Sequence, residues 1–255
     1  METANSIQAA KTSFEARFSE GSYYNRQTQD QAHLDAILAF LPLRRGMRVL
    51  DLGTGSGYLA FALAARHPAL AVTGLDIAEK TLEQNRIRAA AEHLHNLDFV
   101  AGNGMTLPFA DAAFDLVITR YSLHHFPDIR GSIAQVRRVL KQGGAFFLSD
   151  PAPNPGDENG FADAYMRLKP DGHIRLYTAA EWQALCGEQG LVLHDLFESS
   201  IRFPRKTEQM PGLDALLKQH NAQVIAGYGL EIGETEVWIT ERVSNLLFRA
   251  EDDER

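Results

Sequence analysis

The chain has 255 residues, which is enough for one sizeable α/β domain and too few for two domains of ordinary size. Its hydrophobic share of 45% and charged share of 23% are close to globular averages, which argues against a disordered chain or a membrane protein. The net charge of −8 argues against a large nucleic-acid or anionic-membrane surface, because such surfaces need clustered lysine and arginine.

Other simple features narrow the class further. The lone cysteine, Cys186, cannot form an internal disulfide, and the nine histidines are scattered without the short spacings of a metal site, so no metal ion is expected. The first twenty residues lack the apolar stretch of a secretory signal, and no run approaches the roughly 20 apolar residues of a membrane span. We expect a single cytoplasmic domain without membrane insertion, present as a monomer or homodimer.

In chain order, the first part of the sequence alternates between helical and strand patterns. An amphipathic helix over residues 27–41 precedes a short apolar strand at 47–52, a glycine-rich turn and a helix at 58–65. Further strands and helices alternate up to residue 148, which predicts right-handed crossovers and a doubly wound α/β fold with a parallel sheet. The later strands are at 71–75, 97–100, 114–119 and 145–148, and the later helices at 80–94 and 129–140.

The second part of the chain opens with a stretch rich in proline, glycine and aspartate, from residue 151 to 178, with a short helix near 161–168. It follows a strand on the edge where open α/β sheets bind ligands, so it is either a substrate lid or a surface excursion. We expect one domain in four parts. These are an N-terminal helical cap (1–45), a cofactor-binding core (46–150), a lid (151–178), and a C-terminal part that completes the sheet (179–255), with helices at 179–188 and 213–220 and strands at 191–196 and 237–248.

The most informative segment is the loop after the first strand, where Gly53, Gly55 and Gly57 stand at alternate positions. Glycine lets the backbone turn sharply and admits a ligand against it. A dinucleotide fingerprint would place its third glycine at position 58, where this chain has Tyr58. An ordinary turn is the alternative interpretation of these glycines, but the loop does not match a dinucleotide site.

Two acids accompany this loop. Asp51 at its mouth would repel a pyrophosphate but suits a ligand that carries an ammonium group, and Asp76 at the end of the next strand suits ribose hydroxyls. S-adenosylmethionine has an ammonium group and ribose hydroxyls and no phosphate. Asp76 is less decisive, because nicotinamide enzymes use the same device and because an acid after a strand is often a helix N-cap.

With these residues in place, the chain resembles class I S-adenosylmethionine-dependent methyltransferases. The branch is that of the ubiquinone and menaquinone biosynthesis methyltransferases and the type 11 methyltransferase domain. The resemblance runs from about residue 49 to 191 and implies a Rossmann-like sheet of seven mostly parallel strands with a final antiparallel strand and helices on both faces. Besides the glycine loop, it rests on the segments at 107–109, 114–117, 120–126 and 138–144.

The resemblance also implies which residues bind the cofactor. Asp51, Gly53, Thr54 and Gly55 are expected at the methionine end. Asp76 is expected at the ribose, with Ile77 against the adenine. Asn103, Gly104 and Met105 are expected at the adenine edge, where many relatives have aspartate at position 103, and Arg120 is expected to begin the loop beneath the methionine.

Candidate substrate residues come from two further segments. Relatives carry a tyrosine in the N-terminal segment that closes over the cofactor, and Tyr23 or Tyr24 is the matching residue here, although two adjacent tyrosines also fit a packing role. The segment 172–177 looks like the region where relatives place an arginine, so His173, Arg175 and Tyr177 are candidates. The sequence leaves open whether that arginine binds substrate or a neighbouring acid.

Methyl transfer from a sulfonium mainly requires orientation and exclusion of water, and it needs a base only when the acceptor holds a proton at neutral pH. His124 and His125 follow the fourth strand, where one or both either bond backbone carbonyls and shape the loop or supply the base; if one of them is the base, we expect it to be His125. The predicted function is C- or O-methylation of a small molecule. Methylation of a tRNA nucleoside and a non-catalytic S-adenosylmethionine-binding role are the alternatives.

Overall fold

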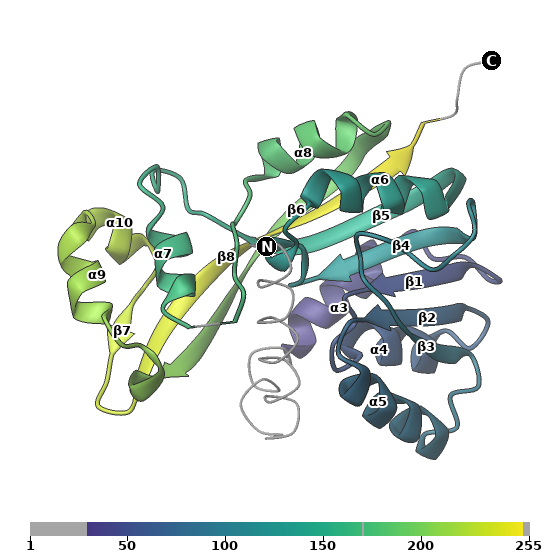
Figure 1. The fold of residues 1–255 in the computed structure, drawn as a ribbon, viewed down its shortest axis with the longest axis horizontal. Coiled ribbons are helices and arrows are strands. Elements are labelled where there is room, and N and C mark those ends of the chain that lie inside the picture. Colours follow the sequence, from purple (N-terminus) through teal and green to yellow (C-terminus); the bar gives the residue numbers. More distant parts are fainter. Residues whose placement is uncertain (1–29, 170, 252–255) are drawn as a thin grey trace.

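The computed structural model describes residues 30–169 and 171–251. Figure 1 shows the arrangement of the elements, which keep the labels of that figure here. The main strands and the helices that connect them follow one another in the order expected for a doubly wound fold. The elements up to the fifth strand are α3 (Gln31–Phe40), β1 (Arg48–Leu52), α4 (Tyr58–Arg66), β2 (Ala71–Asp76), α5 (Glu79–Ala91), β3 (Leu97–Ala101), β4 (Phe114–Arg120), α6 (Ile129–Val139) and β5 (Leu140–Ala152).

The elements after β5 build the other end of the sheet and the region beyond it. Two of them, β6 and β8, are the longest strands described and pair along their whole length. Short helices lie between them in the sequence. These elements are α7 (Phe161–Arg167), α8 (Ala179–Gly187), β6 (Leu191–Lys206), α9 (Leu213–Gln219), α10 (Ala222–Gly227), β7 (Glu231–Ile232) and β8 (Glu236–Ala250).

The sheet has the strand order β3-β2-β1-β4-β5-β8-β6, with β7 paired to β8. The first five strands in this order are parallel, and β8 runs antiparallel to both of its neighbours. The expected Rossmann-like fold with a late antiparallel strand is therefore confirmed, with β7 as an additional short strand. The strands β2 and β3 lie on one side of β1, and β4 and β5 lie on the other. The strand order therefore switches between β1 and β4, which is where such sheets bind ligands.

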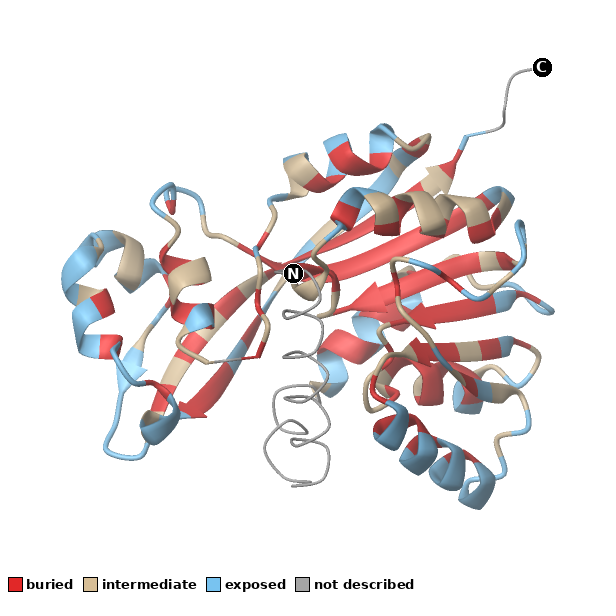
Figure 2. Ribbon diagram, in the orientation of Figure 1, coloured by how far each residue is buried: buried red, intermediate tan, exposed pale blue. Residues whose placement is uncertain are grey.

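Helices cover both faces of this sheet and bury it, as Figures 1 and 2 show. One hydrophobic core joins α3, α4 and α5 to one face, and a second core joins α6 and α8 to the other. Strands buried on both faces read as continuous apolar runs, as in residues 116–118 of β4. No helix in the described part of the chain is long and apolar enough to span a bilayer.

A third hydrophobic core lies beyond the carboxyl ends of the parallel strands (Figure 1). Here α7, α9 and α10 pack against the outer halves of β6 and β8, and we call this region the outer lobe. Asp157 ties it together, because its carboxylate accepts hydrogen bonds from the backbone of Phe161 and Ala162 and from the Tyr228 hydroxyl. The aromatic rings of Phe161 and Tyr228 lie 5.3 Å apart in the same core.

Three sequence expectations need correction here. The strand expected at 145–148 runs on to Ala152, so the stretch treated as a lid from residue 151 begins inside a strand. Pro151 is tolerated there because β4 has ended and β5 pairs only with β8 at that point. The strand expected to end at 196 continues to Lys206, and α10 and β7 were not expected. The short helix expected near 161–168 is present as α7.

Candidate functional site

A cavity opens at the carboxyl ends of β1, β2 and β4, where the loops that follow these strands meet. The structure brings all ten residues expected around the cofactor into its lining, although they come from four separate segments of the chain. His125, the expected base, lines the same cavity. The ten are Asp51, Gly53, Thr54, Gly55, Asp76, Ile77, Asn103, Gly104, Met105 and Arg120.

The glycine loop has the backbone that its sequence requires. Gly53, Gly55 and Gly57 have φ angles of 72°, 50° and 78°, in the left-handed region that other residues adopt at a cost. Gly53 is also needed for space, because a Cβ atom there would lie 1.9 Å from the Ser122 hydroxyl oxygen. The loop therefore presses its bare backbone against the segment that follows β4 and forms one wall of the cavity.

Asp51 is the anionic group of this wall and is 3% exposed. The Thr54 hydroxyl donates a 2.7 Å hydrogen bond to its Oδ2. Burial raises the pKa of Asp51 to about 7, and the neighbouring Asp76 acts in the same direction. A buried carboxylate of this kind gains most from a cation that pairs with it, so the wall suits an ammonium or sulfonium ligand.

Asp76 lies across the loop from Asp51 and joins the two strands of the site. Its Oδ2 accepts a 2.8 Å hydrogen bond from the backbone of Gly55, and its Oδ1 accepts a 2.9 Å bond from the backbone of Ala78. The N-cap of α5 is Ala78, so Asp76 does not serve as the cap itself. The backbone of Ile77 also donates to this carboxylate, and a lone pair still remains for a hydroxyl donor such as that of a ribose.

Arg120 brings a positive charge to the same cavity. Its guanidinium lies 4.4 Å from the ring centre of Tyr58 and 4.6 Å from that of Tyr121, and its Nη2 donates a 3.4 Å hydrogen bond to His33 Nδ1. Burial and this arginine lower the pKa of His33 to about 4, so His33 accepts the bond as a neutral ring. Within residues 30–169 and 171–251, Nε of Arg120 has no hydrogen-bond partner, so a donor remains for an anionic ligand group.

Apolar side chains and one amide form another part of the cavity lining. Ile77, Met105 and Phe126 supply the apolar walls that suit a purine ring. The side-chain oxygen of Asn103 accepts a 2.9 Å hydrogen bond from the backbone of Met105, which holds the amide in place. Gly104 keeps Phe126 close, because a Cβ atom at Gly104 would lie 2.2 Å from its ring.

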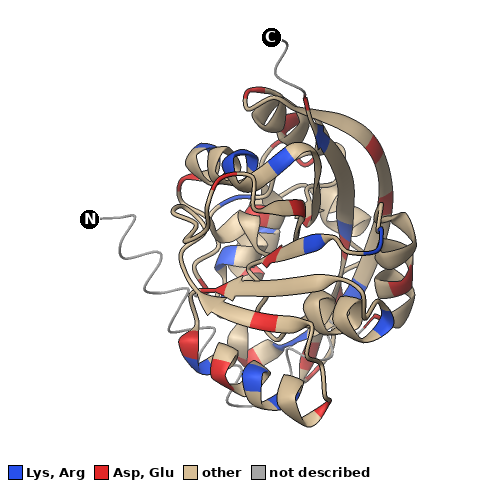
Figure 3. Ribbon diagram, turned by 90° about the vertical axis from the view of Figure 1, so that its right-hand side faces the viewer, with Lys and Arg blue, Asp and Glu red and all other residues tan. Residues whose placement is uncertain are grey.

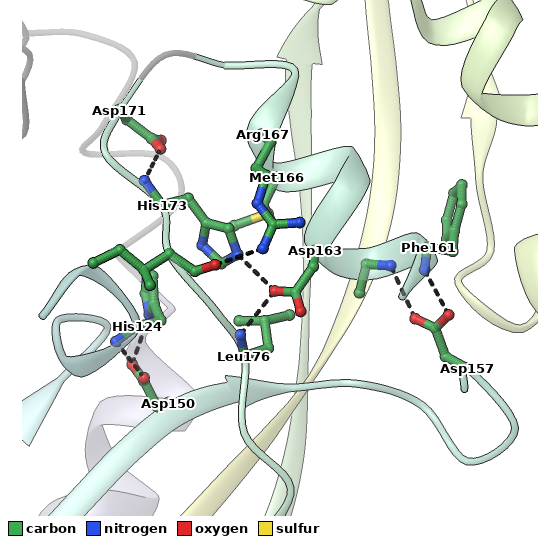
Figure 4. Close-up of polar contacts among 12 residues, drawn as sticks. His124, Asp150, Asp157, Phe161, Asp163, Met166, Arg167, Asp171, His173 and Leu176 are labelled. Carbon is green, nitrogen blue, oxygen red and sulfur yellow. Dashed lines mark hydrogen bonds and ion pairs between the residues drawn. The ribbon is translucent and has the colours of Figure 1, made fainter. Parts of the chain in front are cut away.

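The two adjacent histidines have different surroundings. His124 is paired through Nδ1 with Asp150 at 3.0 Å, and its backbone amide binds the same carboxylate (Figure 4). Burial lowers the pKa of His124, but Asp150 outweighs it, and the net shift is upward. His125 lines the cavity, and burial followed by the charge of His124 lowers its pKa well below the usual value. His124 therefore shapes the loop, while His125 presents a neutral imidazole to the cavity.

The three candidates from segment 172–177 do not line the cavity. His173 is buried and bound through Nε2 to Asp163 at 2.7 Å (Figure 4), and Tyr177 packs on Trp182 with ring centres 4.6 Å apart. Arg175 is exposed and forms an ion pair with Glu181. The arginine thus binds a neighbouring acid, which was one of the two expected alternatives. Tyr23 and Tyr24 lie outside the described residues.

Sequence reasoning missed several residues of the cavity wall, notably Tyr58, Tyr121, Ser122 and Phe126. Tyr58 directly follows the glycine loop and Phe126 directly follows His125. Their closeness in the sequence to these expected site residues could have identified them. Tyr121 has a φ angle of 53°, a strained conformation for a bulky residue that often marks a functional site. Across the described ranges, no group of three or more histidine, cysteine or acidic side chains could hold a metal ion.

Comparison with known proteins places this geometry in a family. A family model described as a methyltransferase domain matches residues 43–203, which is more than half of the chain. The chain is 38% identical over 159 residues to the 27-O-demethylrifamycin SV methyltransferase of Amycolatopsis mediterranei, covering 62% of this chain and 58% of that protein. It is 40% identical over 176 residues to the ubiquinone/menaquinone biosynthesis C-methyltransferase UbiE of Methylobacterium nodulans, covering 66% and 64%.

The match therefore spans less than two thirds of the length of these relatives. The crystal structure of the YcgJ protein from Bacillus subtilis superimposes with a TM-score of 0.76 at 24% identity, covering 87% of this chain and 99% of that chain, and it shows the shared fold. The cavity offers an anionic, a cationic and a hydroxyl-binding position, which fits S-adenosylmethionine as the family's cofactor. The chain belongs to the class I S-adenosylmethionine-dependent methyltransferases.

Proposed function

We propose that the chain transfers a methyl group from S-adenosylmethionine to a carbon or oxygen atom of a small molecule. The observation that supports this most is the pair of opposite charges in one cavity. The methionine end of the cofactor is a zwitterion, and Asp51 and Arg120 would hold its ammonium and its carboxylate. Asp76 would hold the ribose hydroxyls, while Asn103 and the apolar wall would hold the adenine.

The preference for a small acceptor rests on the relatives and on the charges. By their names, the Amycolatopsis relative methylates a rifamycin, and the Methylobacterium relative is a C-methyltransferase of ubiquinone and menaquinone biosynthesis. In the view of Figure 3, basic and acidic residues of the described chain are interspersed, and neither sign dominates that side. A tRNA-nucleoside methyltransferase would need a basic surface for the phosphates, which the net charge of −8 does not favour.

When bound, the cofactor supplies a methyl group that is already activated by the positive charge on sulfur. The residues of the chain have to orient the acceptor, exclude water and take its proton where it has one. His125 is our candidate for that last step, because its neutral imidazole lines the cavity. Its low pKa makes it a weak base, which suits an acidic hydroxyl or enol better than an aliphatic alcohol or amine.

Calorimetric titration of the purified chain with S-adenosylmethionine, S-adenosylhomocysteine and NAD tests this proposal. We expect both sulfur compounds to bind with micromolar dissociation constants and NAD not to bind, because Asp51 repels a pyrophosphate. Binding of NAD in place of the sulfur compounds would overturn the proposal. Tight cofactor binding without transfer of a radiolabelled methyl group to any metabolite fraction would favour a non-catalytic binding protein.

A further inference from the structure

A segment outside the cofactor cavity packs against the loop that presents His125. It comprises residues 172–176, between α7 and α8, and we call it the clamp. The backbone amides of Ile174 and Arg175 both donate to the carbonyl oxygen of His124, at 3.0 and 3.3 Å. The clamp is therefore hydrogen-bonded to the residue that directly precedes the candidate base.

The clamp also contacts the ring of His125 itself. The rings of His173 and His125 lie with their centres 6.2 Å apart and at an angle of 86°. Burial lowers the pKa of His125 most and the charge of His124 lowers it further, whereas a hydrogen bond with the backbone of Gly172 acts in the opposite direction. A backbone group raises the pKa of an imidazole only when its carbonyl oxygen accepts from a ring N–H, because that bond favours the protonated ring. One ring nitrogen of His125 therefore donates to the Gly172 carbonyl oxygen.

The bond to Gly172 determines how His125 can act. A neutral imidazole carries one proton, so one ring nitrogen donates and the other accepts. The position of the proton is set by the hydrogen bond that the donating nitrogen makes. Because one nitrogen of His125 donates to the Gly172 carbonyl oxygen, the other nitrogen is left without the proton, as a general base requires.

Asp163 on α7 holds the clamp from the side of the outer lobe (Figure 4). Its Oδ1 accepts hydrogen bonds from Nε2 of His173 at 2.7 Å and from the backbone amide of Leu176 at 2.8 Å, near the two ends of the clamp. Burial lowers the pKa of His173 and outweighs the bond to Asp163, so the ring is neutral and donates from Nε2. Arg167, four residues later on α7, donates to the Ile174 carbonyl oxygen at 2.6 Å.

The loop of His125 has a second anchor that does not involve the clamp. Asp150 on β5 accepts hydrogen bonds from the backbone amides of Ser122 and His124 at 3.2 and 3.1 Å. The loop also rests against Gly53, where the Ser122 hydroxyl fills the space that a Cβ atom would take. Loss of the clamp should therefore leave the loop and the cofactor cavity in place, while the His125 ring loses its fixed position.

We propose that Asp163 is a positioning residue for methyl transfer, which acts through the clamp to hold the His125 ring in one orientation and one tautomer. The contacts run from Asp163 to His173, and from the clamp to His124 and the His125 ring. This inference rests on the proposed function, because a fixed tautomer serves catalysis only if His125 takes a proton. It extends that function by making α7 of the outer lobe part of the apparatus that prepares the base.

The test is nitrogen NMR of the full chain with isotope-labelled histidine, saturated with S-adenosylhomocysteine at about pH 7.5, where a histidine of ordinary or lowered pKa is mostly neutral. The ring nitrogen shifts of a neutral histidine distinguish its two tautomers, and the signal missing from His125→Asn identifies His125. We expect one tautomer in the unmodified chain and a mixture of both in Asp163→Ala. In Asp163→Asn the amide oxygen still accepts from His173 and Leu176, so we expect a single tautomer again.

Methyl transfer gives the second measurement. Transfer of radiolabelled methyl groups to a metabolite fraction should fall about 10- to 100-fold in Asp163→Ala and recover in Asp163→Asn, because a displaced base reacts poorly. Affinity for S-adenosylhomocysteine should stay within twofold, which also shows that the variant is folded. The matched control is Asp157→Ala, which removes three hydrogen bonds from the same lobe without touching the clamp and should leave both measurements unchanged.

A single tautomer in Asp163→Ala would overturn the proposal. A mixture of tautomers in Asp157→Ala as well would also overturn it, because the effect would then come from a general loosening of the lobe. A mixture in Asp163→Ala together with full turnover in His125→Asn would retain the hold of the clamp on the ring but refute His125 as the base, which is a failure of the proposed function. Should Asp163→Ala fail to fold, His173→Phe decides, because it removes one of the same bonds and keeps a ring of similar size.

Discussion

The cofactor cavity and the outer lobe are built in different ways from the same sheet. The cavity is made of short loops at the ends of parallel strands, with contacts inside a loop, such as Thr54 with Asp51, and contacts between neighbouring loops, such as Gly55 with Asp76. The outer lobe depends on partners far apart, such as Asp157 with Tyr228 and Glu241 opposite Ile201. We propose that the strand-end loops hold the cofactor and that the pairing in the outer lobe does not contribute to cofactor binding.

The strongest test of this comparison concerns His125, at the boundary between the two regions. Replacing His125 with Asn keeps a planar polar side chain but removes the basic ring nitrogen, so we expect turnover to fall by about 10²- to 10⁴-fold. The measurement is the transfer of radiolabelled methyl groups from S-adenosylmethionine to a metabolite fraction. The matched control is His95→Asn on the surface. A loss of less than about tenfold would reject the role of His125 as a base.

The next largest effect is expected from the backbone of the glycine loop. Gly53→Ala adds a Cβ atom against the Ser122 hydroxyl and forces alanine into a left-handed conformation. We expect the dissociation constant of S-adenosylhomocysteine to rise on the order of 100-fold in calorimetry. Gly187→Ala is the control, because Gly187 has open space around it. An affinity within threefold of the unmodified chain would show that this loop does not contact the cofactor.

A smaller effect, with a characteristic pH dependence, is expected at Asp51. Its pKa of about 7 in the folded chain lies above the ordinary value of 3.8. Between about pH 4 and 7 the unfolded chain has released this proton while the folded chain still holds it. The stability of the ligand-free protein therefore falls as pH rises through this range. The cofactor ammonium needs the ionised carboxylate. The dissociation constant should therefore rise tenfold for each pH unit below about 7 and stay level above it.

Asp51→Asn sharpens that prediction, because the amide cannot ionise. At pH 8 we expect affinity for S-adenosylhomocysteine to fall about tenfold, as for a lost charge-assisted hydrogen bond, and the dependence between pH 5 and 7 to flatten. The comparison is calorimetry of both proteins across this pH range. An identical pH profile in the variant would assign the titration to another group.

The smallest effect on cofactor binding is expected from a change in the outer lobe. Asp157→Ala leaves the backbone amides of Phe161 and Ala162 and the Tyr228 hydroxyl without their acceptor, so we expect the free energy of unfolding to fall by about 2 kcal/mol. Affinity for S-adenosylhomocysteine should stay within twofold. Asp214→Ala on α9 is exposed and should change stability by less than about 0.5 kcal/mol. A parallel loss of cofactor affinity in Asp157→Ala would show that the two regions are not independent.

The sequence predicted the parallel half of the fold well and the antiparallel half only partly. Strands such as β4 are apolar on both faces, so a short run of residues identifies them. The continuation of β6 beyond residue 196 passes through polar and exposed positions and Pro204, which resemble a loop until β8 is seen beside them. Pro151 misled in the same way, because the edge position that tolerates it exists only in the assembled sheet.

By itself, the sequence determined the fold class, the family and the residues around the cofactor cavity, because left-handed glycines, acids after strands and apolar runs act over a few neighbouring residues. The tertiary structure alone decided that His124 pairs with Asp150 while His125 faces the cavity, and that Arg175 binds Glu181. It also decided that Arg205 and Glu241 share a buried face. Their separation of 36 positions carries no local signal, and only the pairing of β6 with β8 brings them together.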